Sequence, residues 1–209
     1  MATEIELKAR VYDSEALKIL LYEKAEYVSA FKKEDTYWLL APGLTALPDP
    51  RRLRVRREQR SHLDGKTVSA TVVTYKLKEL RDGMEVNEEL EFAVTPGVEF
   101  EEFLKSMGFT PGMSKKKQGW DFSRNGINAE LVEVESLGWF IELEILAKNT
   151  GNPEEVIAEA RERLFGFLDE LGISRDDIES RYYTEMLKDQ TCRQQERAPD
   201  SQNAQDNAF

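Results

Sequence analysis

Residues 1–10, MATEIELKAR, place three charged side chains, Glu4, Glu6 and Lys8, in strict alternation with apolar ones. Residues two apart in an extended strand point to the same face, so the three charges share one face and the apolar residues share the other. Two carboxylates beside an ammonium are typical of a strand that lines a polar cavity holding a metal ion and its anionic ligand. The alternative is an amphipathic strand with a solvated face, and this segment alone leaves both open.

Length, charge and cysteine content narrow the class of protein. The chain has 209 residues and a formal net charge of -11, which suits one substantial domain and argues against a general nucleic-acid-binding protein. No apolar run reaches the roughly 18–20 residues of a membrane span, and the N-terminus does not resemble a signal peptide. The single cysteine, Cys192, excludes an intramolecular disulfide. We therefore expect a cytoplasmic protein with neither a membrane nor a nucleic-acid partner.

Hydrophobic alternation and turn residues predict an α+β domain built around an antiparallel sheet. Strands are predicted at 4–12, 37–40, 52–60, 66–79, 85–94, 114–123, 127–135 and 139–147. Helices are predicted at about 14–25, 95–107, 153–171 and 175–188. From Asp189 onward the sequence is polar with few apolar residues, which predicts a disordered tail. The expected organisation is one domain over residues 1–188 and a tail over 189–209.

Pairs of like charges recur at i, i+2 along several of the predicted strands. These pairs are Arg54 with Arg56, Lys76 with Lys78, Glu89 with Glu91 and Glu142 with Glu144, and a run of three lysines, 115–117, begins a later strand. In a closed barrel, inner residues alternate with outer ones along every strand, so such pairs can line one lumen. A lumen lined by Arg and Lys requires a bound polyanion, and Arg matches phosphate oxygens bidentately. Carboxylates beside phosphates indicate a hard divalent cation.

Six segments, in this order and spacing, resemble the CYTH superfamily, the triphosphate tunnel metalloenzymes, which include class IV adenylate cyclases, thiamine triphosphatases and inorganic triphosphatases. The N-terminal Glu-x-Glu-x-Lys is similar to the ExExK signature of that family. The other segments are DTYW at 35–38, LRVR at 53–56, TYK at 74–76, LGWFIELE at 137–144 and SRYYTEML at 180–187. The resemblance covers about residues 2–188.

The resemblance implies an eight-stranded antiparallel β-barrel, the triphosphate tunnel, with flanking helices, and a triphosphate substrate bound with Mg²⁺ or Mn²⁺. The metal ligands it implies are Glu4, Glu6, Glu142 and Glu144. The phosphate-binding residues it implies are Lys8, Arg54, Arg56, Lys76, Lys78, Lys117 as the choice within 115–117, and Arg181 at the tunnel mouth. The implied catalytic set is Glu4, Glu6, Lys8 and Glu89. The resemblance also makes a homodimer an expectation.

Two positions depart from the family pattern. Asn87 stands where the fifth strand commonly has an arginine, and Val132 stands where a metal-binding aspartate is usual. Glu130 lies two residues earlier, on the same strand face, and is the candidate replacement ligand. These departures bear on rate and substrate choice rather than on the fold.

Three functions remain open on the sequence. The first is metal-dependent hydrolysis of inorganic triphosphate, thiamine triphosphate or a nucleoside triphosphate. The second is an adenylate cyclase that forms cyclic AMP and pyrophosphate from ATP. The third is a non-catalytic module that binds polyphosphate or nucleotide, which the two departures favour.

Overall fold

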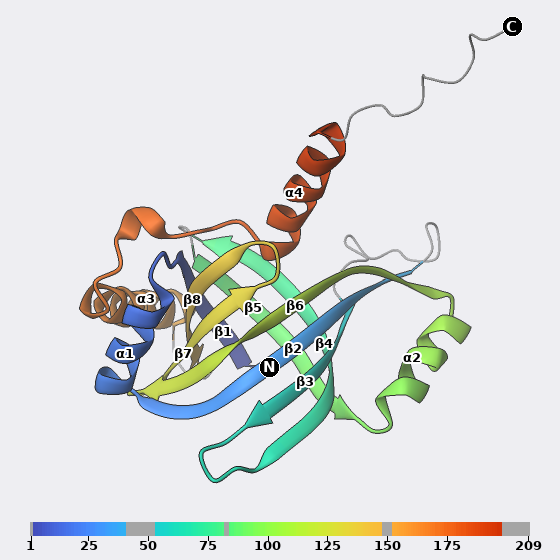
Figure 1. Ribbon diagram of the computed structural model, residues 1–209, viewed down its shortest axis with the longest axis horizontal. Coiled ribbons are helices and arrows are strands. Elements are labelled where there is room, and N and C mark those ends of the chain that lie inside the picture. Colours follow the sequence, from blue (N-terminus) through green and yellow to red (C-terminus); the bar gives the residue numbers. More distant parts are fainter. Residues whose placement is uncertain (1, 41–52, 82–83, 148–151, 198–209) are drawn as a thin grey trace, which may run out of the picture.

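The computed structural model describes residues 2–40, 53–81, 84–147 and 152–197, and its strands close into one antiparallel barrel (Figure 1). The strands are β1 (Ala2–Arg10), β2 (Glu26–Leu40), β3 (Leu53–Ser61), β4 (Thr67–Arg81), β5 (Met84–Val94), β6 (Phe109–Arg124), β7 (Ile127–Val134) and β8 (Gly138–Ala147). Their order around the barrel is β1-β5-β4-β3-β2-β6-β7-β8, and β8 pairs again with β1. The predicted α+β class and eight-stranded barrel are therefore confirmed.

Helices cover part of the outer surface of this barrel. They are α1 (Ser14–Lys24), α2 (Gly97–Ser106), α3 (Pro153–Glu170) and α4 (Tyr183–Arg197), with a short 3-10 helix, η2 (Arg175–Asp177). In Figure 1, α1 and α3 lie on one side of the barrel, α2 lies on the other, and α4 projects from one end. Asp13 accepts a hydrogen bond from the Ala16 amide, and Asn152 accepts one from the Glu154 amide, so both α1 and α3 begin at a capping side chain.

Two hydrophobic cores lie outside the barrel wall, between strands and helices. The larger one joins the outward-facing residues of β1, β7 and β8 to α1 and α3, and includes Leu7, Leu131, Leu143, Leu17 and Leu164. The smaller one lies under α2 and consists of Trp38, Val55, Val73 and Leu104. Because the apolar residues of each strand serve these outer cores, the alternate residues of the same strands face the lumen.

Three sequence expectations are wrong. The strand predicted at 37–40 is only the end of β2, which begins at Glu26. The helix predicted at 175–188 is instead the short η2 followed by a separate helix, α4, that continues to Arg197. Residues 189–197 are therefore helical and not a disordered tail, while 198–209 lie outside the described residues. Among the helices that the structure describes, none has the length and apolar character needed to cross a membrane.

Candidate active site

The lumen of the barrel contains a cavity of about 600 Å³ whose wall is mostly charged. Nearly every described site residue predicted from the sequence lines it, namely Glu4, Glu6, Arg54, Arg56, Lys76, Glu89, Lys117, Glu130, Glu142 and Glu144. They come from seven strands. The inward direction of each side chain follows from the alternation of inner and outer positions along its strand. The cavity divides into an acidic and a basic part.

The acidic cluster consists of Glu4, Glu6, Glu85, Glu89 and Glu144, on β1, β5 and β8. The Lys76 ammonium from β4 lies among these carboxylates: it contacts Glu4 directly and lies 2.7 Å from Glu89 and 3.9 Å from Glu6. A second ammonium, that of Lys8, lies 3.4 Å from Glu85. Five carboxylates thus share two lysines, so the cluster carries an excess of negative charge.

This excess changes the protonation of two carboxyl groups. Burial, together with the charges of Glu85 and Glu142, raises the pKa of Glu6 to about 8. Burial and the charges of Glu4 and Glu6 raise the pKa of Glu144 to about 9. Both groups therefore hold a proton near neutral pH unless a further cation enters the cluster.

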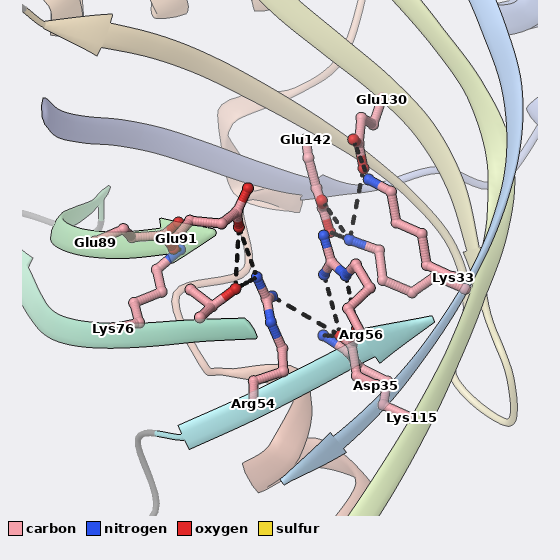
Figure 2. Close-up of polar contacts among 12 residues, drawn as sticks. Lys33, Asp35, Arg54, Arg56, Lys76, Glu89, Glu91, Lys115, Glu130 and Glu142 are labelled. Carbon is pink, nitrogen blue, oxygen red and sulfur yellow. Dashed lines mark hydrogen bonds and ion pairs between the residues drawn. The ribbon is translucent and has the colours of Figure 1, made fainter. Parts of the chain in front are cut away.

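The basic cluster consists of Lys33, Arg54, Arg56, Lys115 and Lys117, on β2, β3 and β6. Figure 2 shows Arg54, Arg56 and Lys115 converging on the buried carboxylate of Asp35. Two Arg56 nitrogens donate to Asp35 at 2.7 and 3.1 Å, and the Lys115 ammonium lies 3.2 Å from it. Burial alone would raise the pKa of Asp35, but these charges outweigh burial and hold the pKa well below its ordinary value.

Lys115 is buried and has like charges as neighbours. Burial lowers the pKa of the Lys115 ammonium to about 8; the attraction of Asp35 opposes this, and repulsion from Lys117 and Arg56 adds to it. The single carboxylate of Asp35 therefore compensates its cationic neighbours incompletely. An additional anion in the lumen would stabilise the charged form of this lysine.

Glu130 and Glu142 form ion pairs with lysines of the basic cluster. The Lys117 ammonium lies 2.6 Å from Glu142 and 3.7 Å from Glu130, and Lys33 forms a direct ion pair with Glu130. Burial would raise the pKa of Glu142, but Lys117 lowers it overall. This favours a counter-ion role for both residues over the metal-ligand role expected from the sequence.

Of the three remaining predicted phosphate-binding residues, two lie elsewhere than expected. Arg181 does not line the cavity; it is half exposed and lies 2.7 Å from Glu179. Lys8 is buried with Glu85 beside the cavity rather than in its wall. Lys78 lies in β4 opposite Asn87, and its side chain is outside the described residues. The choice of Lys117 within the run 115–117 is incomplete, because Lys115 faces inward as well.

Sequence reasoning missed several lumen residues, among them Lys33, Arg60, Glu85 and Tyr183. Parity could have found Arg60 and Glu85, because each continues an i, i+2 series through a predicted inward residue, whereas Lys33 precedes the strand predicted at 37–40. Tyr183, the first residue of α4, could not be found in this way. Its ring lies 4.6 Å from the Lys8 ammonium and 5.1 Å from that of Lys115, so α4 supplies an aromatic face to lysines of the lumen.

Val132 occupies the position at which the family resemblance leads us to expect a metal-binding aspartate. Its side chain is fully buried and packs with Phe31, Phe140 and Tyr183. Asn87 is also buried and donates from Nδ2 to Glu4 at 3.2 Å and to Glu85 at 3.5 Å. Asn87 therefore links two carboxylates without adding a positive charge.

The donor set suits a hard divalent cation. Carboxylate oxygens are the ligands that Mg²⁺ and Mn²⁺ prefer, and the buried Oδ1 of Asn87 has no hydrogen-bond partner among the described residues. No three acidic side chains of the described ranges form a preformed metal site, and the cation lying among Glu4, Glu6 and Glu89 is the Lys76 ammonium. The carboxylates of the acidic cluster therefore have the chemistry to bind a divalent cation. In this structure the Lys76 ammonium supplies the positive charge among them.

The raised pKa values make a prediction about stability and pH. Because the folded protein binds protons at Glu6 and Glu144 that the unfolded chain releases above about pH 4.5, stability must fall as the pH rises towards 8 and 9. We expect the metal-free protein to show a Tm several degrees lower at pH 8.5 than at pH 6, measured by calorimetry in EDTA. Glu144→Gln should flatten this dependence. An unchanged slope in that variant would contradict the assignment.

Comparison with known proteins agrees with this geometry. The CYTH domain pattern matches residues 2–183, most of the chain. A curated protein of Methanocaldococcus jannaschii, named "Putative adenylate cyclase MJ0240", is 28% identical over 114 residues. That match covers 54% of this chain and 63% of the relative, so it spans less than two thirds of the relative's length.

Solved structures share the fold over nearly the whole chain. The PH1819 protein of Pyrococcus horikoshii OT3 is 25% identical, with a TM-score of 0.72, covering 90% of this chain and 99% of that one. A Hippeastrum protein, HpAC1, whose structure is described as revealing a dominant triphosphatase activity, is 18% identical, with a TM-score of 0.62. It covers 91% of this chain and 96% of that one, and at this identity the likeness concerns the fold alone.

Proposed function

The chain belongs to the CYTH domain family, and from this we propose that it is a divalent-metal-dependent triphosphatase, which hydrolyses a triphosphate-containing substrate inside the barrel. One observation carries the proposal: a buried basic cluster short of anions lies in the same lumen as an acidic cluster short of cations. A triphosphate and a divalent cation would complete both. A barrel with a purely structural role would not need a buried basic cluster that lacks anions beside an acidic cluster that lacks cations, and neither would a solvated charged face.

The basic cluster would hold the phosphates. Arg54 and Arg56 can match phosphate oxygens with planar guanidinium groups, and Lys115 and Lys117 supply point charges. The buried Nε of Arg54 has no hydrogen-bond acceptor among the described residues, so it is available to a ligand. Charges fixed in a buried lumen stabilise the charge that develops on the transferred phosphoryl group without reorganising during the reaction.

The acidic cluster would hold the metal. Glu4, Glu6 and Glu144 are its proposed ligands, because all three line the cavity and two of them have raised pKa values that a bound cation would reverse. A divalent cation bound there supplies Lewis-acid stabilisation of phosphate charge and lowers the pKa of coordinated water. Glu89, whose carboxylate lies 2.7 Å from the Lys76 ammonium, is the proposed acceptor of the proton of an attacking water.

Two alternatives remain and one experiment separates all three. The curated relative's name favours an adenylate cyclase, and the apolar Val132 favours a module that binds without turnover. We would incubate the purified protein with tripolyphosphate, thiamine triphosphate or ATP, each with Mg²⁺ or Mn²⁺, and measure released phosphate, cyclic AMP and, by calorimetry, the Kd of each triphosphate. Phosphate release supports the proposal. Cyclic AMP with pyrophosphate selects the cyclase, and tight triphosphate binding without turnover selects the module.

Glu130 offers a sharper test of the metal site. Because its carboxylate pairs with Lys33 and Lys117, we expect Glu130→Gln to change the metal concentration for half-maximal activity by less than about twofold. The same variant should lose about 3 kcal/mol or more of unfolding free energy, because it leaves buried Lys33 without its partner. Metal titration of activity and urea denaturation measure the two effects. A large rise in the metal requirement, with stability unchanged, would restore Glu130 as a metal ligand.

A further inference from the structure

Lys76 is a basic residue that lies in the acidic part of the lumen. Its ammonium contacts Glu4 directly and lies 2.7 Å from Glu89 and 3.9 Å from Glu6. The Lys76 side chain is only 13% exposed, and the three carboxylates come from two strands, β1 and β5. One ammonium therefore links carboxylates of two strands that would otherwise repel one another.

The Lys76 ammonium contacts the same carboxylates as the proposed metal. Glu4 and Glu6 are proposed metal ligands, and Mg²⁺ lies about 2 Å from each oxygen that it binds. Because the ammonium already contacts Glu4, a divalent cation bound to the same carboxylates would be in close contact with a like charge. Metal binding at Glu4 and Glu6 therefore requires the Lys76 ammonium to move.

The inner face of β4 leads from Lys76 to the basic cluster. Thr74 is the preceding inward residue of that strand, about 7 Å away along the backbone, and it pairs with Arg54 of β3. Nη2 of Arg54 donates to Oγ1 of Thr74 at 2.9 Å, and Thr74 donates to Glu91 at 3.0 Å. Figure 2 shows Lys76 and Arg54 extending into the lumen from neighbouring strands. A phosphate bound by Arg54 would therefore lie within reach of the flexible Lys76 side chain.

We propose that Lys76 is an exchangeable counter-ion, whose ammonium leaves the acidic cluster when a divalent cation binds there and moves to a phosphate of the bound triphosphate. The metal and the triphosphate therefore strengthen each other's binding, because the triphosphate accepts the lysine that the metal displaces. This inference rests on the proposed function, since it takes the acidic cluster as the metal site and the basic cluster as the triphosphate site.

The test measures the Kd of Mn²⁺ by electron paramagnetic resonance, with and without a non-hydrolysable methylene-bridged analogue of tripolyphosphate. The proteins are the wild type, Lys76→Gln, which removes the charge, Lys76→Arg, which keeps it, and a matched control, Lys116→Gln. Lys116 is exposed on β6, so the control makes the same change of charge away from the lumen. Chelation of Mn²⁺ by the analogue in solution is the same for all four proteins, so ratios between proteins report the site.

The variants should separate competition by Lys76 from other effects of charge. Without the analogue, Lys76→Gln should bind Mn²⁺ about tenfold more tightly than the wild type, because no ammonium competes for Glu4 and Glu6. Lys76→Arg should bind Mn²⁺ no more tightly than the wild type, and Lys116→Gln should stay within about twofold of it. The analogue should raise the Mn²⁺ affinity of the wild type by a factor about tenfold larger than in Lys76→Gln, which has no lysine to transfer.

A second measurement follows the ammonium itself in the wild-type protein. The nitrogen NMR signal of the Lys76 ammonium, identified by its absence in Lys76→Arg, should shift when Mg²⁺ is added alone. This readout holds even if Lys76→Gln folds poorly. An Mn²⁺ affinity that does not rise in Lys76→Gln, an equal effect of the analogue on both proteins, or a Lys76 signal that does not move at saturating Mg²⁺ would overturn the inference.

Failure of the proposed function gives a different result. A wild-type protein that hydrolyses no triphosphate, while Lys76→Gln still binds Mn²⁺ more tightly and the analogue still acts through Lys76, would exclude the triphosphatase and support the exchange of counter-ions. Hydrolysis by the wild type without these binding differences would support the triphosphatase and exclude the exchange.

Discussion

Replacing both Glu4 and Glu6 by glutamine should reduce metal-dependent triphosphate turnover by about a thousandfold, the scale of losing a preorganised group that stabilises transition-state charge. Both carboxylates face the cavity from β1. Glutamine keeps their size but removes two of the charges that would bind the cation. The Lys76 ammonium keeps Glu89 at 2.7 Å, so the variant should still fold. Phosphate release and direct Mn²⁺ binding, followed by electron paramagnetic resonance, measure the effect.

The matched control for this variant is Glu88→Gln. Glu88 is exposed on β5, directly across from Thr3, and points away from the lumen. Its replacement changes the net charge by one without touching the acidic cluster, so Mn²⁺ binding and turnover should both remain at wild-type levels. Full metal-dependent turnover in Glu4→Gln/Glu6→Gln would exclude the acidic cluster as the metal site.

The sequence predicted the inner faces of most strands correctly because side-chain direction in a strand depends only on parity. Arg54 and Arg56, or Glu142 and Glu144, need no tertiary information to share a face. Closure of the barrel is different. Alternation does not say that β1 pairs with both β5 and β8, and that expectation came from the family resemblance.

The misplaced elements have physical causes. Alternation does not predict the first part of β2, because Lys32, Lys33, Glu34 and Asp35 are consecutive charged residues. A strand of an antiparallel sheet usually has one apolar face. In this barrel the lumen is charged and the outer surface there is solvated, so both faces are polar. The polarity of the residues beyond Asp189 predicts a disordered tail, but α4 begins at buried Tyr183 and its first turns pack with Val132 and Phe140.

Which residues line the lumen was easier to predict than which ion pairs they form there. Glu130 and Lys33 are 97 residues apart, and Glu142 and Lys117 are 25 apart. Which carboxylate neutralises which lysine depends on how the strands stagger when the barrel closes. The sequence therefore predicted a single set of inward acidic side chains. In the structure some of them form the acidic cluster beside Lys76, while Glu130 and Glu142 pair with lysines of the basic cluster.

Asp35 should have the largest effect on stability of any single residue in the lumen. Its buried carboxylate binds Arg56 and Lys115 and lies 3.9 Å from Arg54. Asp35→Asn keeps the shape but leaves these cations without their shared anion, and breaking a buried ion pair in this way costs about 3–5 kcal/mol. Urea denaturation without ligand measures the loss. Glu34→Gln, one residue away on the exposed face of β2, should change stability by less than about 0.5 kcal/mol.

The same variant tests whether the basic cluster is an anion site. Asp35 has a strongly lowered pKa, so in the wild type it remains ionised, and its contribution to stability is lost progressively as the pH falls from the ordinary pKa of 3.8 to that lowered pKa. In Asp35→Asn, a bound tripolyphosphate would supply the missing negative charge, so it should stabilise the variant more than it stabilises the wild type. A thermal shift larger in the variant than in the wild type supports phosphate binding at Arg54, Arg56 and Lys115. An equal or smaller shift would place the triphosphate elsewhere, because only an anion bound beside these cations can replace Asp35.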